Sequence, residues 1–126
     1  MGKPEAVLQR SVCQYLDRAL PHGWAYWHNH QNAPTVQAQK RLKALGVKAG
    51  LPDMMVVGPT GDNEPGVNLI VIELKSAKGR TTEAQEDWLD RFQRMGAHAT
   101  VCRSIEDVQD TLNFAGVSLR ASLGEG

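Results

Sequence analysis

Two short apolar runs, each with a charged residue at one end, constrain the fold of this chain more than any other feature. Residues 54–57, MMVV, follow Asp53, and residues 69–72, LIVI, lead into Glu73-Leu74-Lys75. Apolar runs of this length between turn formers predict interior β-strands. The sequence between the runs, GPTGDNEPG, is rich in turn formers and predicts a hairpin loop. We therefore expect two interior strands of one sheet.

The rest of the chain predicts four helices and two further strands. Residues 4–20 and 82–95 carry apolar side chains at helical spacing, and the breakers Pro21 and Gly96 follow them. Thr35, Thr82 and Ser104 are suited to N-terminal caps of helices that end near residues 45, 95 and 114. Segments 24–28 and 97–102 predict strands. The order helix, strand, helix, strand, strand, helix, strand, helix predicts an α/β domain with a central sheet.

Size and composition indicate one globular domain. The 126 residues leave little room for a second core, so we expect a domain over residues 1–116 and a tail over residues 117–126. No apolar run approaches the roughly 20 residues of a membrane-spanning helix, and the first residues lack the apolar stretch of a signal peptide. We therefore expect a cytoplasmic protein without a membrane partner. Cys13 and Cys102 lack CxxC spacing and suggest reduced thiols.

The distribution of charge is more informative than its balance. Fourteen basic residues offset fourteen acidic ones, yet no acidic residue lies between Asp17 and Asp53. That interval contains Arg18, Lys40, Arg41, Lys43 and Lys48, together with three histidines. Such a stretch fits a surface that faces a polyanion, and it equally fits an ordinary solvated face.

The charged residues beside the two apolar runs suggest a metal-dependent hydrolytic site. Side chains alternate along a strand, so Glu73 and Lys75 are expected on one side, with Leu74 on the other. If the two strands pair, Asp53 converges with Glu73, and the Leu74 carbonyl can join them around one hard cation. Such oxygen ligands suit Mg²⁺ or Mn²⁺, and the lysine can orient the attacking water. The alternative is a weak surface ion pair, although two charges ending an apolar run need a specific reason.

These residues resemble a known nuclease family. Gly50-Leu51-Pro52-Asp53, then Glu73-Leu74-Lys75 and then Gln85 look like the virus-type replication-repair nuclease (VRR-NUC) branch of the PD-(D/E)xK superfamily. Glu5 and Gln9 in the first predicted helix also fit that branch. The resemblance implies a restriction-endonuclease-like αβββαβ core, with a mixed sheet flanked by helices. It also implies divalent-metal hydrolysis of phosphodiesters in branched DNA. Stand-alone phage-type members are similar in size to this chain.

The resemblance assigns roles by position. Asp53 and Glu73 become metal ligands, Lys75 handles the attacking water, and Glu5 becomes a further metal or water ligand. Gln85 is expected to hydrogen-bond near Lys75 or the scissile phosphate. Each of the last two has a structural alternative, because Glu5 at a helix start is favoured by the helix dipole, and Gln85 stands at capping-box spacing after Thr82. We expect that Gln85 does not serve both purposes.

Other features lead to weaker expectations. His28-Asn29-His30 matches the letters of the HNH nucleases by chance, and a zinc site at the two histidines has no further ligand at suitable spacing. Trp24, Tyr26 and Trp27 are expected in the core, with stacking on unpaired bases as the alternative. The candidates for contacts to the phosphate backbone are Lys40, Arg41, Lys43, Lys48, Lys78 and Arg80.

The sequence therefore predicts a structure-specific DNA endonuclease that needs Mg²⁺ or Mn²⁺ and no small-molecule cofactor. Action at four-way (Holliday) junctions requires two equivalent sites, hence a homodimer in the cytoplasm of a bacterium or a phage-infected host. A monomeric flap- or nick-directed nuclease is the nearest alternative. A DNA-binding module without catalysis has no need of acids that repel phosphate. A hydrolase of small phosphorylated metabolites is disfavoured because no GxxxxGK loop is present.

Overall fold

The computed structural model describes residues 3–29, 33–61 and 63–120. The elements are α1 (Lys3–Ala19), β1 (Ala25–His28), α2 (Val36–Ala44), β2 (Met54–Gly61), β3 (Glu64–Leu74), α3 (Glu83–Arg94), β4 (His98–Cys102) and α4 (Ile105–Phe114). This order confirms the α/β arrangement predicted from the sequence, and the predicted helix and strand boundaries agree closely outside the β2–β3 hairpin.

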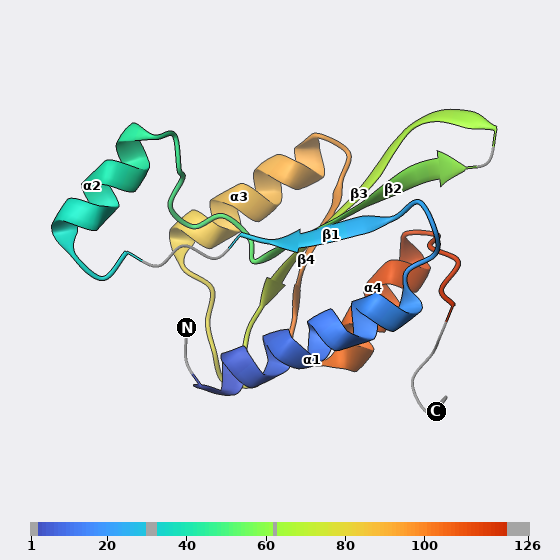
Figure 1. Ribbon diagram of the computed structural model, residues 1–126, viewed down its shortest axis with the longest axis horizontal. Coiled ribbons are helices and arrows are strands. Elements are labelled where there is room, and N and C mark those ends of the chain that lie inside the picture. Colours follow the sequence, from blue (N-terminus) through green and yellow to red (C-terminus); the bar gives the residue numbers. More distant parts are fainter. Residues whose placement is uncertain (1–2, 30–32, 62, 121–126) are drawn as a thin grey trace.

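The four strands form one mixed sheet in the order β1-β2-β3-β4 (Figure 1). β1 pairs with β2 and β2 with β3 in antiparallel register, with Met54 opposite Ile72. β3 and β4 are parallel, with Leu74 opposite Cys102, and α3 makes the crossover between them. Parallel neighbours require such a connection, because no tight turn can join them. The predicted αβββαβ core with a mixed sheet is thus confirmed.

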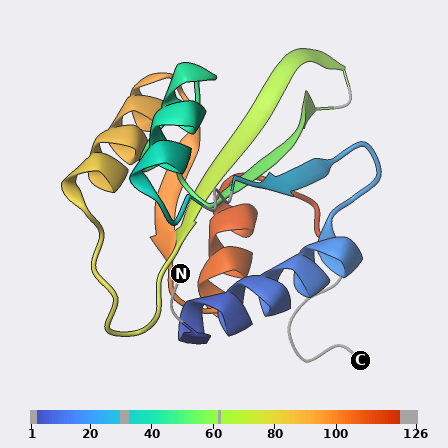
Figure 2. The same ribbon diagram turned by 60° about the vertical axis from the view of Figure 1, so that its left-hand side comes forward.

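Helices cover both faces of the sheet (Figures 1 and 2). On one face, α1 and α4 bury their apolar sides against alternate strand residues. This larger core includes Val12, Leu16, Val56, Ile72 and Leu112. On the other face, Leu89 of α3 packs with Met55, Val71 and Ala99. The alternation places Glu73 on the face of Val71, toward α3. Glu73 therefore lies between the sheet and α3.

The hairpin between β2 and β3 is longer than its sequence predicts. Most of GPTGDNEPG was expected as loop, yet β2 continues to Gly61 and β3 begins at Glu64, with a register shift between Pro59 and Gly61. β1 pairs with β2 only as far as Val57, so Pro59 lies where β2 has an open side and its missing N–H costs no ladder bond. Breaker residues thus end the pairing with β1 and leave the hairpin intact.

α2 stands apart from the sheet, connected to it by extended segments (Figure 1). Thr35 caps its N-terminus, where its Oγ1 accepts a hydrogen bond of 3.0 Å from the Ala38 N–H. None of the nine helical residues is buried. This helix therefore contributes no residue to either core. No helix in the described ranges is long and apolar enough to cross a membrane.

The chain after α4 returns to α1. Val117 is buried in the larger core, and the Arg120 N–H donates a 2.7 Å hydrogen bond to the carbonyl of Ala19. At least the beginning of the segment predicted as a tail therefore packs against the domain. Residues 121–126 and His30 lie outside the described residues, so the expectations made for them remain predictions.

Candidate active site

Asp53 is held between two strands at the start of β2. Its main-chain carbonyl accepts a 2.7 Å hydrogen bond from the Asn29 N–H at the end of β1. Its side-chain Oδ2 accepts a 2.7 Å hydrogen bond from the Leu74 N–H of β3. Pro52 before it is buried and favours the extended backbone that delivers the carboxylate to this position. Asp53 is therefore fixed at both main chain and side chain.

Glu73 and Lys75 lie together at the end of β3 and are the buried charged residues of the described chain. Their exposed fractions are 2% and 8%, and Lys75 Nζ lies 3.6 Å from Glu73 Oε2. The Lys75 N–H also donates to the Cys102 carbonyl of β4 at 3.1 Å. Burying a charge costs several kcal/mol unless it is paired. The alternative of a weak ion pair on the protein surface therefore does not explain why both side chains are buried. The alternation-based prediction that the two side chains share one side is confirmed.

Gln85 of α3 completes the group and corrects one expectation. Its Oε1 accepts a 2.9 Å hydrogen bond from the Thr82 N–H, and its own N–H donates to Thr82 Oγ1 at 3.2 Å, which forms a capping box. Its Nε2 also donates a 3.1 Å hydrogen bond to Glu73 Oε2. The expectation that Gln85 cannot both cap the helix and serve the site was wrong. An amide has separate acceptor and donor ends, and here they face different partners.

The electrostatics of the carboxylates favour a bound cation. Burial and the neighbouring carboxylate of Asp53 raise the pKa of Glu73 to about 8, against the opposing effect of the Lys75 ammonium. Two acids that share one desolvated site resist ionising together. A cation bound between the two carboxylates would offset this repulsion, because it attracts both negative charges.

The donor set fits a divalent cation that retains waters. Glu73 Oε1 is buried and accepts no hydrogen bond from the described residues, so one carboxylate oxygen is left for another partner. With an Asp53 oxygen and the Leu74 carbonyl, the two groups predicted from the sequence to join it, this oxygen would form a set of hard ligands of the kind that Mg²⁺ and Mn²⁺ prefer. No three His, Cys, Asp or Glu side chains of the described ranges gather around one point, so an ion held here would take its remaining ligands from waters or substrate oxygens.

Glu5 lies beside the loop that follows Lys75. A Cβ added to Gly79 would meet Glu5 Oε1 at 3.0 Å and Ser76 Oγ at 3.1 Å. Glu5 does not join Asp53 and Glu73 as a third gathered carboxylate among the described residues. Its assignment as a further metal or water ligand stays a prediction. Its position nonetheless brings the start of α1 to the same end of the sheet.

His28 is a neighbour of the site that sequence reasoning did not assign to it. It ends β1, and its Nε2 lies 3.9 Å from Asp53 Oδ1, with both side chains 18% exposed. Antiparallel pairing places His28 opposite Met54 and so next to the start of β2. The aromatic segment alone does not reveal which strand β1 joins or in what register. Trp24 and Tyr26 pack against the larger core as predicted, whereas Trp27 is 47% exposed.

The six basic candidates fall into two surface groups. Lys78 and Arg80 are exposed on the loop between β3 and α3, close in sequence to Lys75. Lys40, Arg41 and Lys43 are exposed on α2, and Lys48 follows that helix. Lys43 and Lys48 also line a groove of about 610 Å³ that includes Asp53 and Gln85 in its lining. This α2 groove therefore extends from the basic helix to Asp53.

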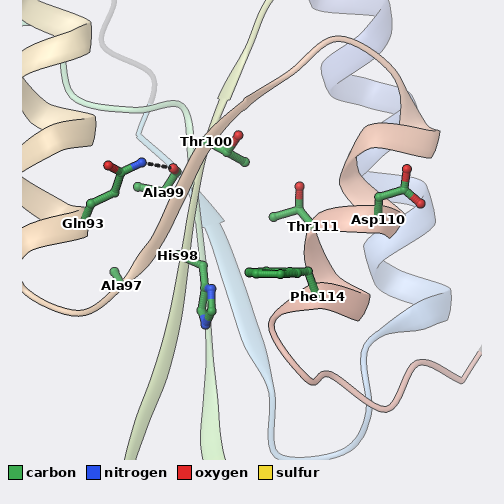
Figure 3. A pocket seen from close by; sticks show the side chains of 8 residues that line it. All are labelled: Gln93, Ala97, His98, Ala99, Thr100, Asp110, Thr111 and Phe114. Atoms are coloured by element: carbon green, nitrogen blue, oxygen red, sulfur yellow. Dashed lines mark hydrogen bonds between the residues drawn. The ribbon is translucent and has the colours of Figure 1, made fainter.

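A second hollow lies at the outer edge of the sheet and contains none of these residues. Figure 3 shows its lining by β4 and by the flanking helices α3 and α4, with the rings of His98 and Phe114 next to each other. The two ring centroids lie 6.0 Å apart in an edge-to-face arrangement. This hollow contains neither the pair of acids nor the lysine of the candidate active site.

The sheet topology and the triad of Asp53, Glu73 and Lys75 define a class, the nucleases of the PD-(D/E)xK type. Comparison with known families agrees, because the VRR-NUC domain family matches residues 7–106. The chain belongs to the VRR-NUC family, and membership implies a nuclease of that type, which generally uses divalent metals. Glu5 lies just outside the matched residues, whereas the triad and Gln85 lie within them.

Solved structures show the same fold. A chain described as "VRR_NUC domain protein" superposes with a TM-score of 0.66 at 22% identity, covering 91% of this chain and 89% of its own. Another, described as "VRR_NUC domain", has a TM-score of 0.56 at 17% identity, covering 89% of this chain and 97% of its own. No curated protein matches the sequence.

Proposed function

We propose that this protein is an endodeoxyribonuclease that uses Mg²⁺ or Mn²⁺ to hydrolyse phosphodiester bonds in branched DNA. The observation that carries the proposal is the meeting of Asp53 and Glu73, from adjacent strands, beside the buried ammonium of Lys75. Acids gathered in this way repel a bare phosphate, so a cation is needed before the substrate can approach. A protein that only bound DNA would gain nothing from them.

Asp53, Glu73 and the Leu74 carbonyl are the groups that would hold the ion. When bound, a divalent ion neutralises charge on the phosphoryl oxygens and lowers the pKa of a bound water. Lys75 orients the attacking water and balances negative charge that develops on phosphorus oxygens. The water oxygen bonds to phosphorus and gives up a proton while one phosphorus–ester oxygen bond breaks, and the departing oxygen takes up a proton. Gln85 is a positioning residue, because it fixes Glu73 Oε2.

Branched DNA as the substrate and a homodimer as the active form belong together. Two strands of a four-way junction are cut symmetrically only by two equivalent sites, which a pair of identical chains supplies. Support for a pairing surface comes from β4, which ends the described sheet, and from Phe114, which is 85% exposed beside it. Light scattering is expected to give twice the chain mass for the wild type and the single mass for Phe114→Glu. A wild-type monomer that cuts only flaps contradicts the junction assignment.

The proposed reaction is tested with purified protein on end-labelled linear, flap and four-way DNA, with and without Mg²⁺ or Mn²⁺. We expect metal-dependent cutting of branched substrates by the wild type. Asp53→Asn and Lys75→Ala should lose at least a hundredfold in rate while still binding DNA, because the apolar strands maintain the fold. Asp87→Asn, an exposed acid of α3, is the matched control and should cut normally. Unchanged cutting by Asp53→Asn contradicts the proposed metal site.

A further inference from the structure

The α2 groove has walls from different parts of the chain and reaches the candidate active site. α2 contributes Leu42 and Lys43, the segment after α2 contributes Val47 and Lys48, and Asp53 also lines the groove. Figures 1 and 2 show α2 set off from the sheet on the side where α3 begins. An occupant of this groove therefore lies next to Asp53.

The floor of the groove is fixed against α3. Gly50 adopts a φ of +78°, and a Cβ added there would meet the Ala84 side chain at 2.8 Å, so only glycine permits this approach. One residue earlier, the Ala49 carbonyl accepts a 3.0 Å hydrogen bond from Trp88 Nε1. Two anchors to α3 keep this segment in place without any ligand. A preformed groove binds its occupant at a lower entropic cost than one that must first close.

The groove combines uncovered apolar side chains with basic ones. Leu42, Val47 and Leu51 are half-buried, and none of them belongs to either core. Lys43 and Lys48 are exposed and form no ion pair with the described residues. Apolar surface beside unpaired positive charge fits a ligand with a flat apolar part and a negatively charged part.

We propose that the α2 groove binds an unpaired nucleotide of the DNA, adjacent to the phosphate that is cut; this inference rests on the proposed nuclease function. The apolar side chains contact the base, and Lys43 and Lys48 contact the flanking phosphates. The volume of about 610 Å³ lies within the range of small-ligand pockets. Within a duplex the faces of the bases are stacked on one another, so only an unpaired base can present a face to the groove. Cutting is thereby directed to branches, flaps and gaps.

Binding measurements without divalent metal test the groove independently of cleavage. Fluorescence anisotropy in EDTA compares a short labelled oligothymidylate with a blunt, fully paired duplex of equal charge. Leu42→Ser/Val47→Ser removes two aliphatic side chains from the groove and should weaken oligothymidylate binding about tenfold, with little effect on the duplex. Leu45→Ser/Val36→Ser is the matched control. It removes the same two residue types from positions of 75% and 66% exposure that do not line the groove, and it should bind as the wild type does.

The outcomes separate the groove from the reaction. Unchanged oligothymidylate binding by Leu42→Ser/Val47→Ser overturns the groove proposal, and so does an equal loss for both DNAs, which indicates a general backbone surface. Neither result bears on whether the wild type cuts DNA in the presence of metal, so the nuclease proposal is tested separately. Conversely, selective loss in the groove variant with no cutting by the wild type supports the groove and overturns the nuclease proposal.

Discussion

Glu73 is the residue whose chemistry depends most on its surroundings. Its carboxyl group is buried beside Asp53, and its pKa is raised to about 8. The folded protein therefore retains the Glu73 proton to a higher pH than the unfolded chain does. The contribution of this group to stability is complete below its unfolded pKa of about 4.5, and it declines as the pH rises through about 8.

Glu73→Gln should therefore stabilise the metal-free protein at alkaline pH. The neutral amide occupies the same space and avoids burying a second negative charge beside Asp53. In EDTA at pH 8.5 or so we expect a gain of about 2 kcal/mol over the wild type, and almost none near pH 4.5. Thermal unfolding at both pH values measures the difference. Asp87→Asn should show no such pH-dependent gain, and equal melting temperatures of Glu73→Gln and wild type at the higher pH argue against the shifted pKa.

Divalent metal should reverse this comparison. At pH 8, Mn²⁺ is expected to raise the melting temperature of the wild type by several degrees, because the ion binds the folded state and compensates both carboxylates. Glu73→Gln loses a negative ligand and should gain little. The measurement is a Mn²⁺ titration followed by thermal unfolding. Equal Mn²⁺-dependent shifts in the two proteins contradict the assignment of Glu73 as a ligand.

The hydrogen bond that Gln85 donates to Glu73 can be tested separately from the capping of α3 by Gln85. Thr82→Ala removes one half of the capping box, whereas Gln85→Ala removes the other half together with the hydrogen bond to Glu73. Both substitutions should lower stability by about 1 kcal/mol. Only Gln85→Ala should also slow cleavage, by at least about tenfold, since supporting hydrogen bonds orient metal ligands. Equal cleavage rates for the two variants at a temperature where both are folded contradict the positioning role.

At the scale of elements, the sequence predicts more of the sheet than of its connections. The period of two along β3 is enough to put Glu73 and Lys75 together, and apolar runs identify β2 and β3. The extended hairpin is different, because whether Pro59 breaks a strand depends on whether another strand lies beside it. His28 was missed for the same reason, since its proximity to Asp53 follows from the β1 register. Which side chains share one side of a strand can be predicted from the sequence. Which residues distant along the chain become neighbours can be determined only from the fold.

The loop between β3 and α3 depends on one arginine after β4. Arg103 Nη1 donates hydrogen bonds of 2.7 Å to the carbonyls of both Ser76 and Gly79. Charge-assisted bonds to two carbonyls fix a turn that, among the described residues, is otherwise held by the Gly79 N–H bond to the Ser76 carbonyl. The loop carries Lys78 and Arg80 and lies beside Glu5. Its order is thus set by a residue that no motif includes.

Arg103→Ala should loosen this loop without unfolding the domain. Hydrogen exchange of residues 76–82 should accelerate about tenfold, whereas exchange in β2 and β3 should change little. Arg94→Ala is the control, because Arg94 pairs with Asp90 on the surface of α3 at 3.0 Å, with side chains 79% and 52% exposed. That exposed pair contributes little, and its loss should leave the loop unchanged. Normal exchange of the loop in Arg103→Ala shows that its order has another source.

At the scale of the whole molecule, net charge and charge distribution indicate different things. The formal net charge is zero, so overall attraction to DNA is weak. The basic residues of α2 and its following segment nevertheless lie beside the carboxylates, and α4 carries Glu106, Asp107 and Asp110. The sequence shows this segregation along the chain. It does not show that Lys43 and Lys48 share a groove with Asp53, which requires the placement of α2.

The salt dependence of DNA binding measures which basic residues face the phosphates. Each phosphate contact made by a lysine releases counterions, so its loss lowers the slope of log K against log salt by about 1. Lys43→Ala/Lys48→Ala should therefore reduce the slope by about 2 and weaken binding to every DNA that reaches the site. Arg10→Ala/Arg18→Ala removes the same charge from exposed positions of α1, which covers the opposite face of the sheet from α3. If that control lowers the slope as much as the lysine pair does, DNA follows α1 instead, and the α2 side of the molecule is not its path to the carboxylates.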